Sequence, residues 1–288
     1  MRPPPPKPSD APLAPGLYVV STPIGNLRDM TLRGIDILAG ADIVLAEDTR
    51  VAHKLLSAYD LKPRVERYDD HTDARRRPQI LAELADGRRI ALISDAGTPL
   101  VSDPGYRLVK AAGEVGLPVF AAPGPSAALA ALAVSGLPSD RFLFAGFSPP
   151  KSGPRRAFLE ELAPIRATLI LYETGPRLAD SLVDMAAVFG DRPAVVAREL
   201  TKLHETVVRG RLSELVAHFD GPPPRGEIVV LVGPPEDVPA TMDDAEAALV
   251  DALSRMSPAE ASSTVAKAFG LNRRDLYQRA LALKSQDR

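Results

Sequence analysis

Two carboxylates and an arginine near the start of the chain could together move a proton and hold an anion. Glu47, Asp48 and Arg50 come directly after Ile43–Ala46, an apolar run typical of a buried strand. A carboxylate at a strand end can accept a proton from a reacting hydroxyl, and an arginine can hold a phosphate or a carboxylate. A structural interpretation is equally open, because Asp48 or Thr49 can also cap the helix that follows.

Three connections built from small residues follow other apolar runs. Ser21–Asn26 follows the run that begins at Leu17, Asp95–Gly105 follows Ile90–Ser94, and Pro123–Ser126 follows Val119–Ala121. Loops at the carboxyl ends of parallel strands are where open α/β sheets bind ligands. Neither a GxGxxG nor a GxxxxGK[ST] pattern is present, so the loops predict a small-molecule or cofactor crevice other than a nicotinamide or P-loop site.

Several kinds of chemistry are excluded or disfavoured by what the sequence lacks. It contains no cysteine and no GxSxG pattern, and its four histidines (His53, His71, His204 and His218) show no metal-ligand spacing. We therefore expect no metal site. His71 stands in a polar cluster, Tyr68–Asp73, and is either part of a site or a solvated surface histidine.

Strands and helices alternate from Leu17 onward, which predicts a mostly parallel sheet covered on both faces. The segment Ser135–Asp140 breaks the composition, and a second α/β set follows it. In that set Tyr172–Gly175 and Arg198–Lys202 again put polar groups at strand ends, so we expect the two halves to face one another across a crevice. The predicted organisation is a disordered Pro-rich segment over 1–15, an α/β domain over 16–136, a second α/β domain over 137–236 and a helical segment over 241–288.

The last segment of the chain is basic and helical. Ser257–Glu260 is a helix start, Gly270 a stop, and 271–281 a second helix, which resembles a helix-turn-helix. Six basic residues against two acidic ones from Lys267 onward give an excess of four positive charges. The segment is either a solvated helical face or an appendage that contacts nucleic-acid phosphates.

The bulk composition is that of an ordinary globular chain. Of the 288 residues, 45% are hydrophobic and 25% charged, and the net charge of −2 provides no general field that would attract a polyanion. No stretch resembles a secretory signal or a membrane helix. These features predict a cytoplasmic protein without a membrane partner.

Several motifs, in order and spacing from about Leu17 to Gly233, resemble the ribosomal RNA small subunit methyltransferase I family of the tetrapyrrole methylase superfamily. They are Thr22–Leu27, Ala46–Arg50, Ser94–Pro99 with Asp103–Gly105, Pro123–Pro125, Ser135–Phe142, Arg198–Lys202 and Gly226–Glu227. The resemblance implies two unlike α/β domains that bind S-adenosylmethionine in the cleft between them. It also implies a homodimer that methylates the ribose 2′-hydroxyl of a cytidine in the decoding region of 16S rRNA in the small ribosomal subunit.

By the same resemblance, three loops of the first domain would line the cofactor and three residues of the second would close over it. These residues are Thr22, Pro23, Ile24, Gly25, Asn26, Asp95, Ala96, Gly97, Thr98, Pro99, Ser126, Ala127, Glu173, Thr201 and Glu227. The RNA-contacting residues are expected to be His71, Arg177, Lys202, Arg273 and Arg274. Methyl transfer to a weakly nucleophilic hydroxyl benefits from a base, and our hypothesis is that Glu47 or Asp48 accepts the proton while Arg50 steadies the RNA backbone.

The chain departs from the family pattern in two places, at His71-Thr72 where the family tends to have His-Asn, and at Thr174–Pro176. These departures bear on substrate contacts rather than on the cofactor site. Two alternative functions remain. One is a precorrin-type methylase acting on a tetrapyrrole carbon, which the Thr22–Asn26 loop and the basic tail disfavour; the other is a non-catalytic RNA-binding ribosome-assembly factor.

Overall fold

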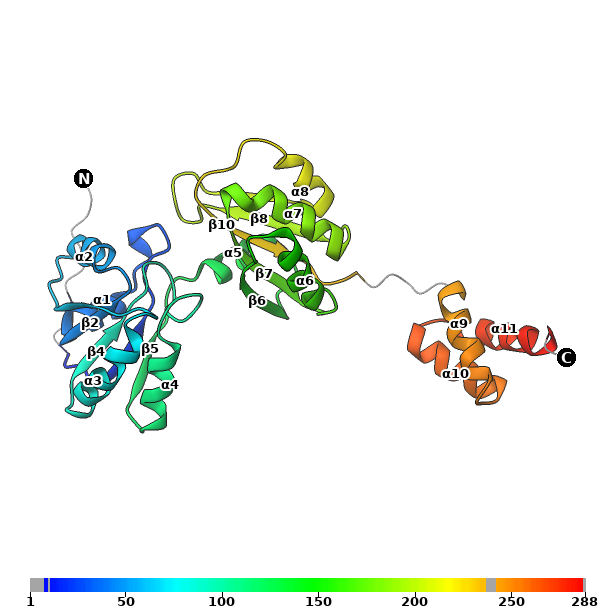
Figure 1. Ribbon diagram of the computed structural model, residues 1–288, viewed down its shortest axis with the longest axis horizontal. Helices are drawn as coiled ribbons and strands as arrows, with labels where there is room; N and C mark the ends of the chain where they lie inside the picture. The colour runs from blue at the N-terminus through cyan, green and yellow to red at the C-terminus, as the bar shows by residue number, and fades with distance from the viewer. Residues whose placement is uncertain (1–7, 10, 237–241, 287–288) are drawn as a thin grey trace. The chain divides into compact units, whose positions relative to one another are not determined.

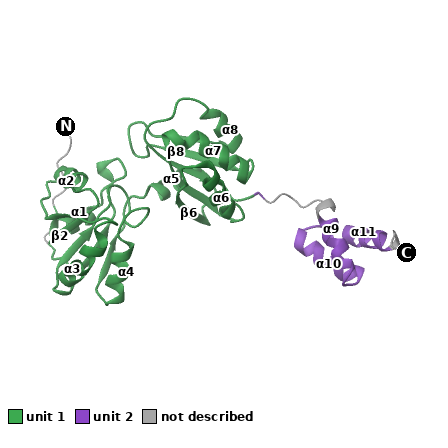
Figure 2. Ribbon diagram, in the orientation of Figure 1, with its two compact units in different colours: residues 1–235 green, residues 236–288 purple. Residues whose placement is uncertain are grey.

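The computed structural model describes residues 8–9, 11–236 and 242–286 (Figure 1). The chain divides into two compact units, residues 1–235 and 236–288 (Figure 2). Both predicted α/β domains lie in the first unit. Much of the Pro-rich segment predicted over 1–15 lies outside the described residues, although Leu13 packs on the core of the first sheet.

The first unit begins with a five-stranded sheet in which every pairing is parallel. Its strands run in the order β3-β2-β4-β1-β5. Their bounds are β1 Gly16–Val20, β2 Ile43–Ala46, β3 Val65–Arg67, β4 Arg89–Leu92 and β5 Val119–Ala122. Because all five strands point the same way, the loops that leave β1, β2, β4 and β5 emerge at one edge of the sheet.

Helices cover both faces of this sheet. They are α1 Leu32–Gly40, α2 Thr49–Ala58, α3 Asp73–Ala85 and α4 Tyr106–Glu114. Apolar side chains alternate along the strands: Tyr18 and Val20 belong to the core under α1 and α2, whereas Leu17 belongs to the core under α3 and α4. This two-sided burial explains why the strands read as continuous apolar runs.

The second sheet is mixed. It runs β6-β7-β10-β8-β9, with β6 parallel to β7 and the other neighbours antiparallel. Its strands are β6 Phe142–Phe147, β7 Thr168–Thr174, β8 Pro193–Arg198, β9 Thr206–Arg211 and β10 Glu227–Val232. Helices α6 Ser152–Leu162, α7 Gly175–Phe189 and α8 Leu212–His218 supply the core residues on one face.

Helix α5, Ala127–Ser135, covers the other face of the second sheet. Its buried residues Ala128, Ala131 and Leu132 share a core with β7, β8 and β10, and Ile24 from the β1–α1 connection joins the same core. The chain therefore passes from the first sheet to the second at Pro123–Ser126, before α5. That point lies earlier than the predicted break at Ser135–Asp140.

The second unit is a bundle of three helices, α9 Met242–Leu253, α10 Pro258–Phe269 and α11 Arg273–Gln286. Ser257 caps α10 in a reciprocal capping box with Glu260, and Gly270 ends the helix in the left-handed conformation, with φ +66°. Leu249, Val265 and Leu276 meet in its small core. The start, stop and second helix predicted from the sequence are confirmed. Within the described residues, no helix has the length and apolar character needed to cross a membrane.

Candidate active site

The three strand-end loops of the first sheet are tied to one another by hydrogen bonds. Thr22 and Gly97 exchange backbone bonds of 2.8 and 3.0 Å, which form a short antiparallel bridge. The Thr98 hydroxyl donates to the Pro125 carbonyl at 3.0 Å and lies 3.1 Å from the Ser21 hydroxyl. The loops after β1, β4 and β5 therefore form one connected wall.

The loop after β4 is held in an unusual backbone conformation. Gly97 and Gly105 have φ values of +82° and +126°, and two residues with side chains, Leu100 and Ser102, have φ values of +74° and +62°. Left-handed conformations of non-glycine residues are costly and cluster where a loop must present groups in a fixed direction. The residues that this loop presents, from Asp95 to Asp103, face a cavity.

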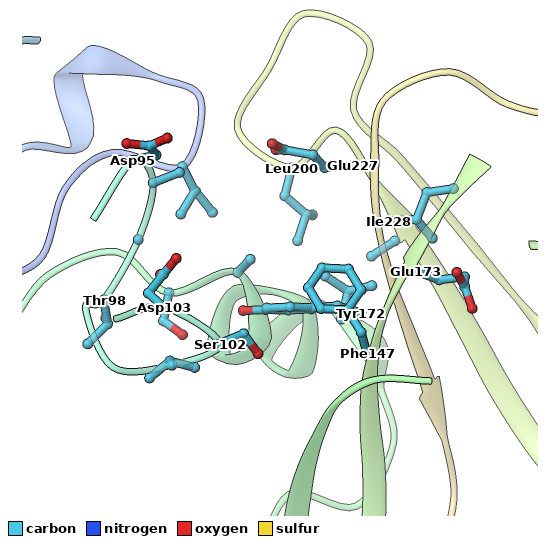
Figure 3. A pocket seen from close by; sticks show the side chains of 18 of the residues that line it. Asp95, Thr98, Ser102, Asp103, Phe147, Tyr172, Glu173, Leu200, Glu227 and Ile228 are labelled. Atoms are coloured by element: carbon cyan, nitrogen blue, oxygen red, sulfur yellow. The ribbon is translucent and has the colours of Figure 1, made fainter. Parts of the chain in front are cut away.

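That cavity has a volume of about 320 Å³ and lies between the first-sheet loops and the second sheet (Figure 3). Figure 3 shows Asp95, Thr98, Ser102 and Asp103 on one side, and Phe147, Tyr172, Leu200, Glu227 and Ile228 on the other. The remaining lining residues are Ile24, Ala96, Gly97, Val101, Ser126, Ala127, Glu173, Thr174, Ala197, Gly226 and Val229. The lining combines apolar walls with a few carboxylates and hydroxyls, as small-molecule sites do.

Aromatic residues form part of the second-sheet wall. The rings of Phe147 and Tyr172 pack edge to face with their centres 5.4 Å apart. Burial raises the pKa of the Tyr172 hydroxyl, and the carboxylates of Asp103 and Glu227 raise it further, against a backbone hydrogen bond with Ala128 that lowers it. Tyr172 is therefore a neutral hydroxyl at physiological pH.

A direct contact joins the β1–α1 connection to the second sheet beside the cavity. The Asn26 backbone amide donates to the Thr201 hydroxyl at 3.1 Å. The Lys202 side chain lies over Gly25, where an added Cβ atom would come within 2.4 Å of Lys202 Cγ. Thr201 itself has φ +68°. These residues hold the two halves of the site together rather than lining it.

Lys202 is neutralised locally. Its ammonium donates to Glu199 at 2.7 Å and to Glu227 at 2.8 Å, and these contacts raise the Lys202 pKa although burial opposes them. The expectation that Lys202 contacts RNA stays a prediction, but in this structure its charge is already paired. Glu227, one of its partners, lines the cavity.

Glu173 anchors a buried polar network behind the cavity. Its side chain is fully buried, and Figure 3 shows it directed away from the cavity. It accepts hydrogen bonds from Ser148 at 2.9 Å, from Ser181 at 2.5 Å and from the Thr174 amide at 2.9 Å, and Arg177 lies 3.0 Å from it. Glu173 and Arg177 therefore act here as positioning residues for the end of β7.

A second cavity, of about 610 Å³, lies at the carboxyl end of the first sheet. It is lined by Glu47, Arg67, Asp69, Asp70, His71, Ser102, Asp103 and Pro104. The Asp69 carboxylate is already used, because it accepts hydrogen bonds from the Thr72 amide and from Arg67, both at 2.7 Å. Ser102 and Asp103 line both this second cavity and the first one.

Among the residues that line the two cavities, Asp103 has the most strongly shifted pKa. Burial, together with the nearby carboxylates of Glu47 and Asp95, raises its pKa to about 6, against a hydrogen bond from Ser94 that lowers it. Burial and the carboxylates of Asp95, Asp69 and Asp70 also raise the pKa of Glu47. Perturbed carboxyl groups in a cleft mark candidate functional residues.

The structure favours the capping interpretation of Asp48. Its carboxylate accepts from the Arg50 amide at 2.8 Å and pairs with the Arg50 guanidinium at 2.6 Å, and these bonds hold the Asp48 pKa far below its usual range. Arg50 is 85% exposed. Of the three predicted catalytic residues, Glu47 lines the 610 Å³ cavity. Asp48 and Arg50 form an ion pair with each other at the start of α2.

The predicted cofactor residues divide into two groups. The first lines the 320 Å³ cavity: Ile24, Asp95, Ala96, Gly97, Thr98, Ser126, Ala127, Glu173 and Glu227. The second does not line it: Thr22, Pro23, Gly25, Asn26, Pro99 and Thr201. Of these, Thr22 bridges to Gly97, and Gly25, Asn26 and Thr201 join the two halves of the site. The sequence-based prediction missed Ser102, Asp103, Phe147, Tyr172 and Leu200, although Asp103-Pro104-Gly105 was visible as a loop motif.

The predicted RNA-contacting arginines of the tail lie at the start of α11. Asn272 precedes them, and its side-chain oxygen Oδ1 accepts from the Arg274 backbone amide at 2.8 Å. Arg273, Arg274 and Tyr277 line a surface hollow of this unit, whereas Arg279 pairs with Glu246 at 2.7 Å. Within the described residues, no group of three or more His, Cys, Asp or Glu residues could hold a metal ion.

Comparison with known proteins matches both parts of the chain. A family model described as Tetrapyrrole (Corrin/Porphyrin) Methylases matches residues 16–216, and one described as RsmI C-terminal HTH domain matches residues 239–284. Among solved structures, uroporphyrin-III-C-methyltransferase from Thermus thermophilus aligns with TM-score 0.54 at 24% identity, covering 75% of this chain and 93% of that one. Diphthine synthase aligns with TM-score 0.57 at 19% identity, covering 75% and 89%.

Three curated relatives match nearly the full length of this chain and of their own. Ribosomal RNA small subunit methyltransferase I of Erythrobacter litoralis is 54% identical and covers 96% of this chain and 98% of its own. The proteins of the same name from Mesorhizobium japonicum and Escherichia coli O157:H7 are 50% and 42% identical, covering 95% and 92% of this chain and 94% of their own length in each case.

Two unlike α/β halves around a loop-lined cavity define a methyltransferase of the tetrapyrrole methylase fold. More particularly, the chain belongs to the ribosomal RNA small subunit methyltransferase I family.

Proposed function

We propose that this protein transfers the methyl group of S-adenosylmethionine to the ribose 2′-hydroxyl of a cytidine in the decoding region of 16S rRNA, within the small ribosomal subunit. The observation that carries the proposal is the cavity between the Asp95–Thr98 loop and the second sheet, in a chain whose full-length relatives are named for small-subunit rRNA methylation. The nucleoside, its position and the 2′-oxygen come from the family resemblance.

The residues present suit S-adenosylmethionine. A volume of about 320 Å³ falls within the range of roughly 300–1,000 Å³ found for small-molecule sites. Ile24, Leu200 and Val229 give apolar contact for a flat heterocycle, while Asp95 and Glu227 offer acceptors for hydroxyl and ammonium groups. When bound there, the cofactor supplies an electrophilic methyl group on a sulfonium.

The protein's own contribution is alignment, exclusion of water and proton transfer. The connected loops after β1, β4 and β5 fix one side of the site, and the contacts of Asn26 with Thr201 fix the other side against it. Alignment of an in-line displacement can lower much of its barrier. A carboxylate near the second cavity would take the hydroxyl proton.

Basic groups at the second cavity and on the helical unit would bind the RNA backbone. His71 and Arg67 border the second cavity, and Arg273 and Arg274 are presented by the separate helical unit. With a net charge of −2, the chain depends on such local groups for RNA affinity. The resemblance also implies a homodimer, and the proposed substrate places the activity in the cytoplasm.

Gly97→Ala is expected to weaken S-adenosylmethionine binding about tenfold or more. The φ of +82° disfavours any side chain by about 1–2 kcal/mol, and a Cβ would come within 3.3 Å of Ile24 Cγ2. A shift of 1.4 kcal/mol corresponds to a factor of ten in affinity. Calorimetric titration measures the change. Gly113→Ala, in α4 with open space around the new Cβ, is the matched control and should bind like the wild type; equal affinity of the Gly97 variant would contradict its role.

The direct test offers methyl-tritiated S-adenosylmethionine to the purified protein with one of three acceptors: small subunits lacking the modification, naked 16S rRNA, or uroporphyrinogen. Label in the ribose of an rRNA cytidine supports the proposal. Label in the tetrapyrrole instead identifies the precorrin-type alternative, and RNA binding without any label at all identifies the assembly-factor alternative.

A further inference from the structure

We propose that Asp103 is the residue that accepts the proton of the acceptor hydroxyl, which approaches it from the cavity lined by Glu47, Asp69, Asp70 and His71. This inference rests on the proposed methyl transfer and names a residue for it. The carboxyl group stands where the two cavities of the site meet, since Ser102 and Asp103 belong to both linings.

A junction position is what the reaction requires. The methyl donor and the acceptor hydroxyl must approach each other from two sides, and the proton acceptor must lie within hydrogen-bond reach of that hydroxyl. The first cavity has the lining that suits the donor, so the second is left for the acceptor nucleoside. The left-handed backbone at Leu100 and Ser102 presents the following carboxyl group at the junction, which accounts for strain in this loop.

The neighbouring groups are less suited to the role. Ser102 also lies at the junction, but a neutral hydroxyl is a poor proton acceptor. Asp48 is capped and paired with Arg50, which makes it strongly acidic. Asp95 lines the donor cavity and Glu47 the acceptor cavity, and neither belongs to both linings.

The groups around Asp103 raise its pKa, which makes its carboxylate a better proton acceptor. Glu47, Arg67, Asp69, Asp70 and His71 face it across the second cavity, and Asp95, Tyr172 and Glu227 across the first. The dominant effects are burial and the carboxylates of Glu47 and Asp95, which raise its pKa to about 6. A carboxylate with this pKa is ionised at neutral pH, yet it is a stronger base than an ordinary aspartate.

The bond changes balance without a further reagent. The hydroxyl oxygen forms a bond to the methyl carbon as the bond between that carbon and sulfur breaks, and the electron pair of the broken bond leaves with sulfur. The hydroxyl proton passes to a carboxylate oxygen of Asp103, which returns it to solvent after the product leaves.

The test compares Asp103→Asn with the wild type on small subunits that lack the modification. We expect kcat to fall by about 10²–10⁴-fold, the usual contribution of a general base, while calorimetry shows a much smaller change in affinity for S-adenosylmethionine, whose cavity Asp103 also lines. In the wild type, kcat should rise with pH up to a plateau above about pH 6, because Asp103 must lose its proton to act. The residual activity of Asp103→Asn should not show that rise.

Two further variants separate chemistry from folding. Asp86→Asn, at the exposed C-cap of α3, is the matched control and should behave as the wild type. Glu47→Gln removes a carboxylate that raises the pKa of Asp103, so the acid limb of the pH profile should move to lower pH. The inference is overturned if kcat of Asp103→Asn stays within threefold of the wild-type value. It is also overturned if the rise of kcat with pH is lost in Glu47→Gln but kept in Asp103→Asn. Absence of transfer by the wild type would refute the proposed function instead.

Discussion

Gly175→Ala is expected to destabilise the first unit by about 3–4 kcal/mol, at the upper end of single-substitution effects. Gly175 begins α7, and a Cβ at this position would lie 1.7 Å from the Pro224 carbonyl oxygen. The obstacle is backbone, so one of the two segments must move. The segment that includes Pro224 leads into Gly226 and Glu227, which line the cavity, and we therefore expect weaker cofactor binding as well.

Chemical denaturation of the Gly175→Ala protein measures the loss. The matched control is Gly153→Ala in α6, where the new Cβ meets nothing within 4 Å; it should be neutral or stabilising by up to about 1 kcal/mol. A Gly175→Ala protein as stable as the wild type would show that the approach of α7 to Pro224 is not a constraint in solution. The same close approach explains why this chain has glycine in the stretch Thr174–Pro176, where it departs from the family pattern.

Glu173→Gln is expected to cost about 3 kcal/mol of stability, because it removes the negative charge from a buried network. Both carboxylate oxygens of Glu173 accept from donors: Oε2 from the two serine hydroxyls, and Oε1 from the Thr174 amide with Arg177 beside it. If the glutamine NH₂ group replaces Oε1, it meets the Thr174 amide and Arg177, which can only donate; if it replaces Oε2, the serine hydroxyls can rotate to accept from it, but Arg177 has lost its counter-charge. Thermal and chemical unfolding measure the effect.

A double-mutant cycle tests the cause of that loss. In an Arg177→Met background, Glu173→Gln should cost less, because the cation left unpaired by the single change is gone. Glu161→Gln, on the exposed surface of α6, is the control and should change stability by less than about 0.5 kcal/mol. A Glu173→Gln effect no larger than that of the control would mean that the network does not support the end of β7.

The strands that the sequence predicted are those with an apolar run, which are β1, β2, β4, β5, β6, β7, β8 and β10. Six of them are central strands, whereas β5 and β6 are edge strands whose residues are nevertheless mostly apolar. β3 and β9 were missed for a common reason: both are edge strands with polar residues, Val-Glu-Arg in β3 and alternating Arg and Gly in the last part of β9. An edge strand needs little burial and can therefore be polar, and a polar strand leaves a weak pattern in the sequence.

Helix α5 was missed for the opposite reason. Ala127–Ser135 is apolar at nearly every position, so it carries no helical alternation. Its position under the second sheet depends on contacts with strands far along the chain, which the sequence does not reveal. The antiparallel directions of β8, β9 and β10 are long-range properties of the same kind.

For the site, the sequence predicted which loops form it better than it predicted what each residue in those loops does. Strand-end position identified Thr22–Asn26 and Asp95–Pro99, and the structure brings both to one edge of the sheet. Whether a residue at the cavity directs its polar group into it depends on side-chain direction: Glu173 lines the cavity, yet its carboxylate bonds to Ser148 on the other side, and Thr201 bonds to Asn26. The aromatic pair Phe147 and Tyr172 could not be predicted, because their approach depends on the pairing of β6 with β7.

The measurement that tests the central claim most directly maps the methyl group at nucleotide resolution. Small subunits lacking the modification are incubated with the wild-type protein and S-adenosylmethionine, and nuclease fragments of their 16S rRNA are sequenced by mass spectrometry. The account predicts one added methyl group, on the ribose of a single decoding-region cytidine, and its strong reduction by Asp103→Asn but not by Asp86→Asn. A methyl group on a base, or no added methyl group with wild-type cofactor affinity, would contradict it.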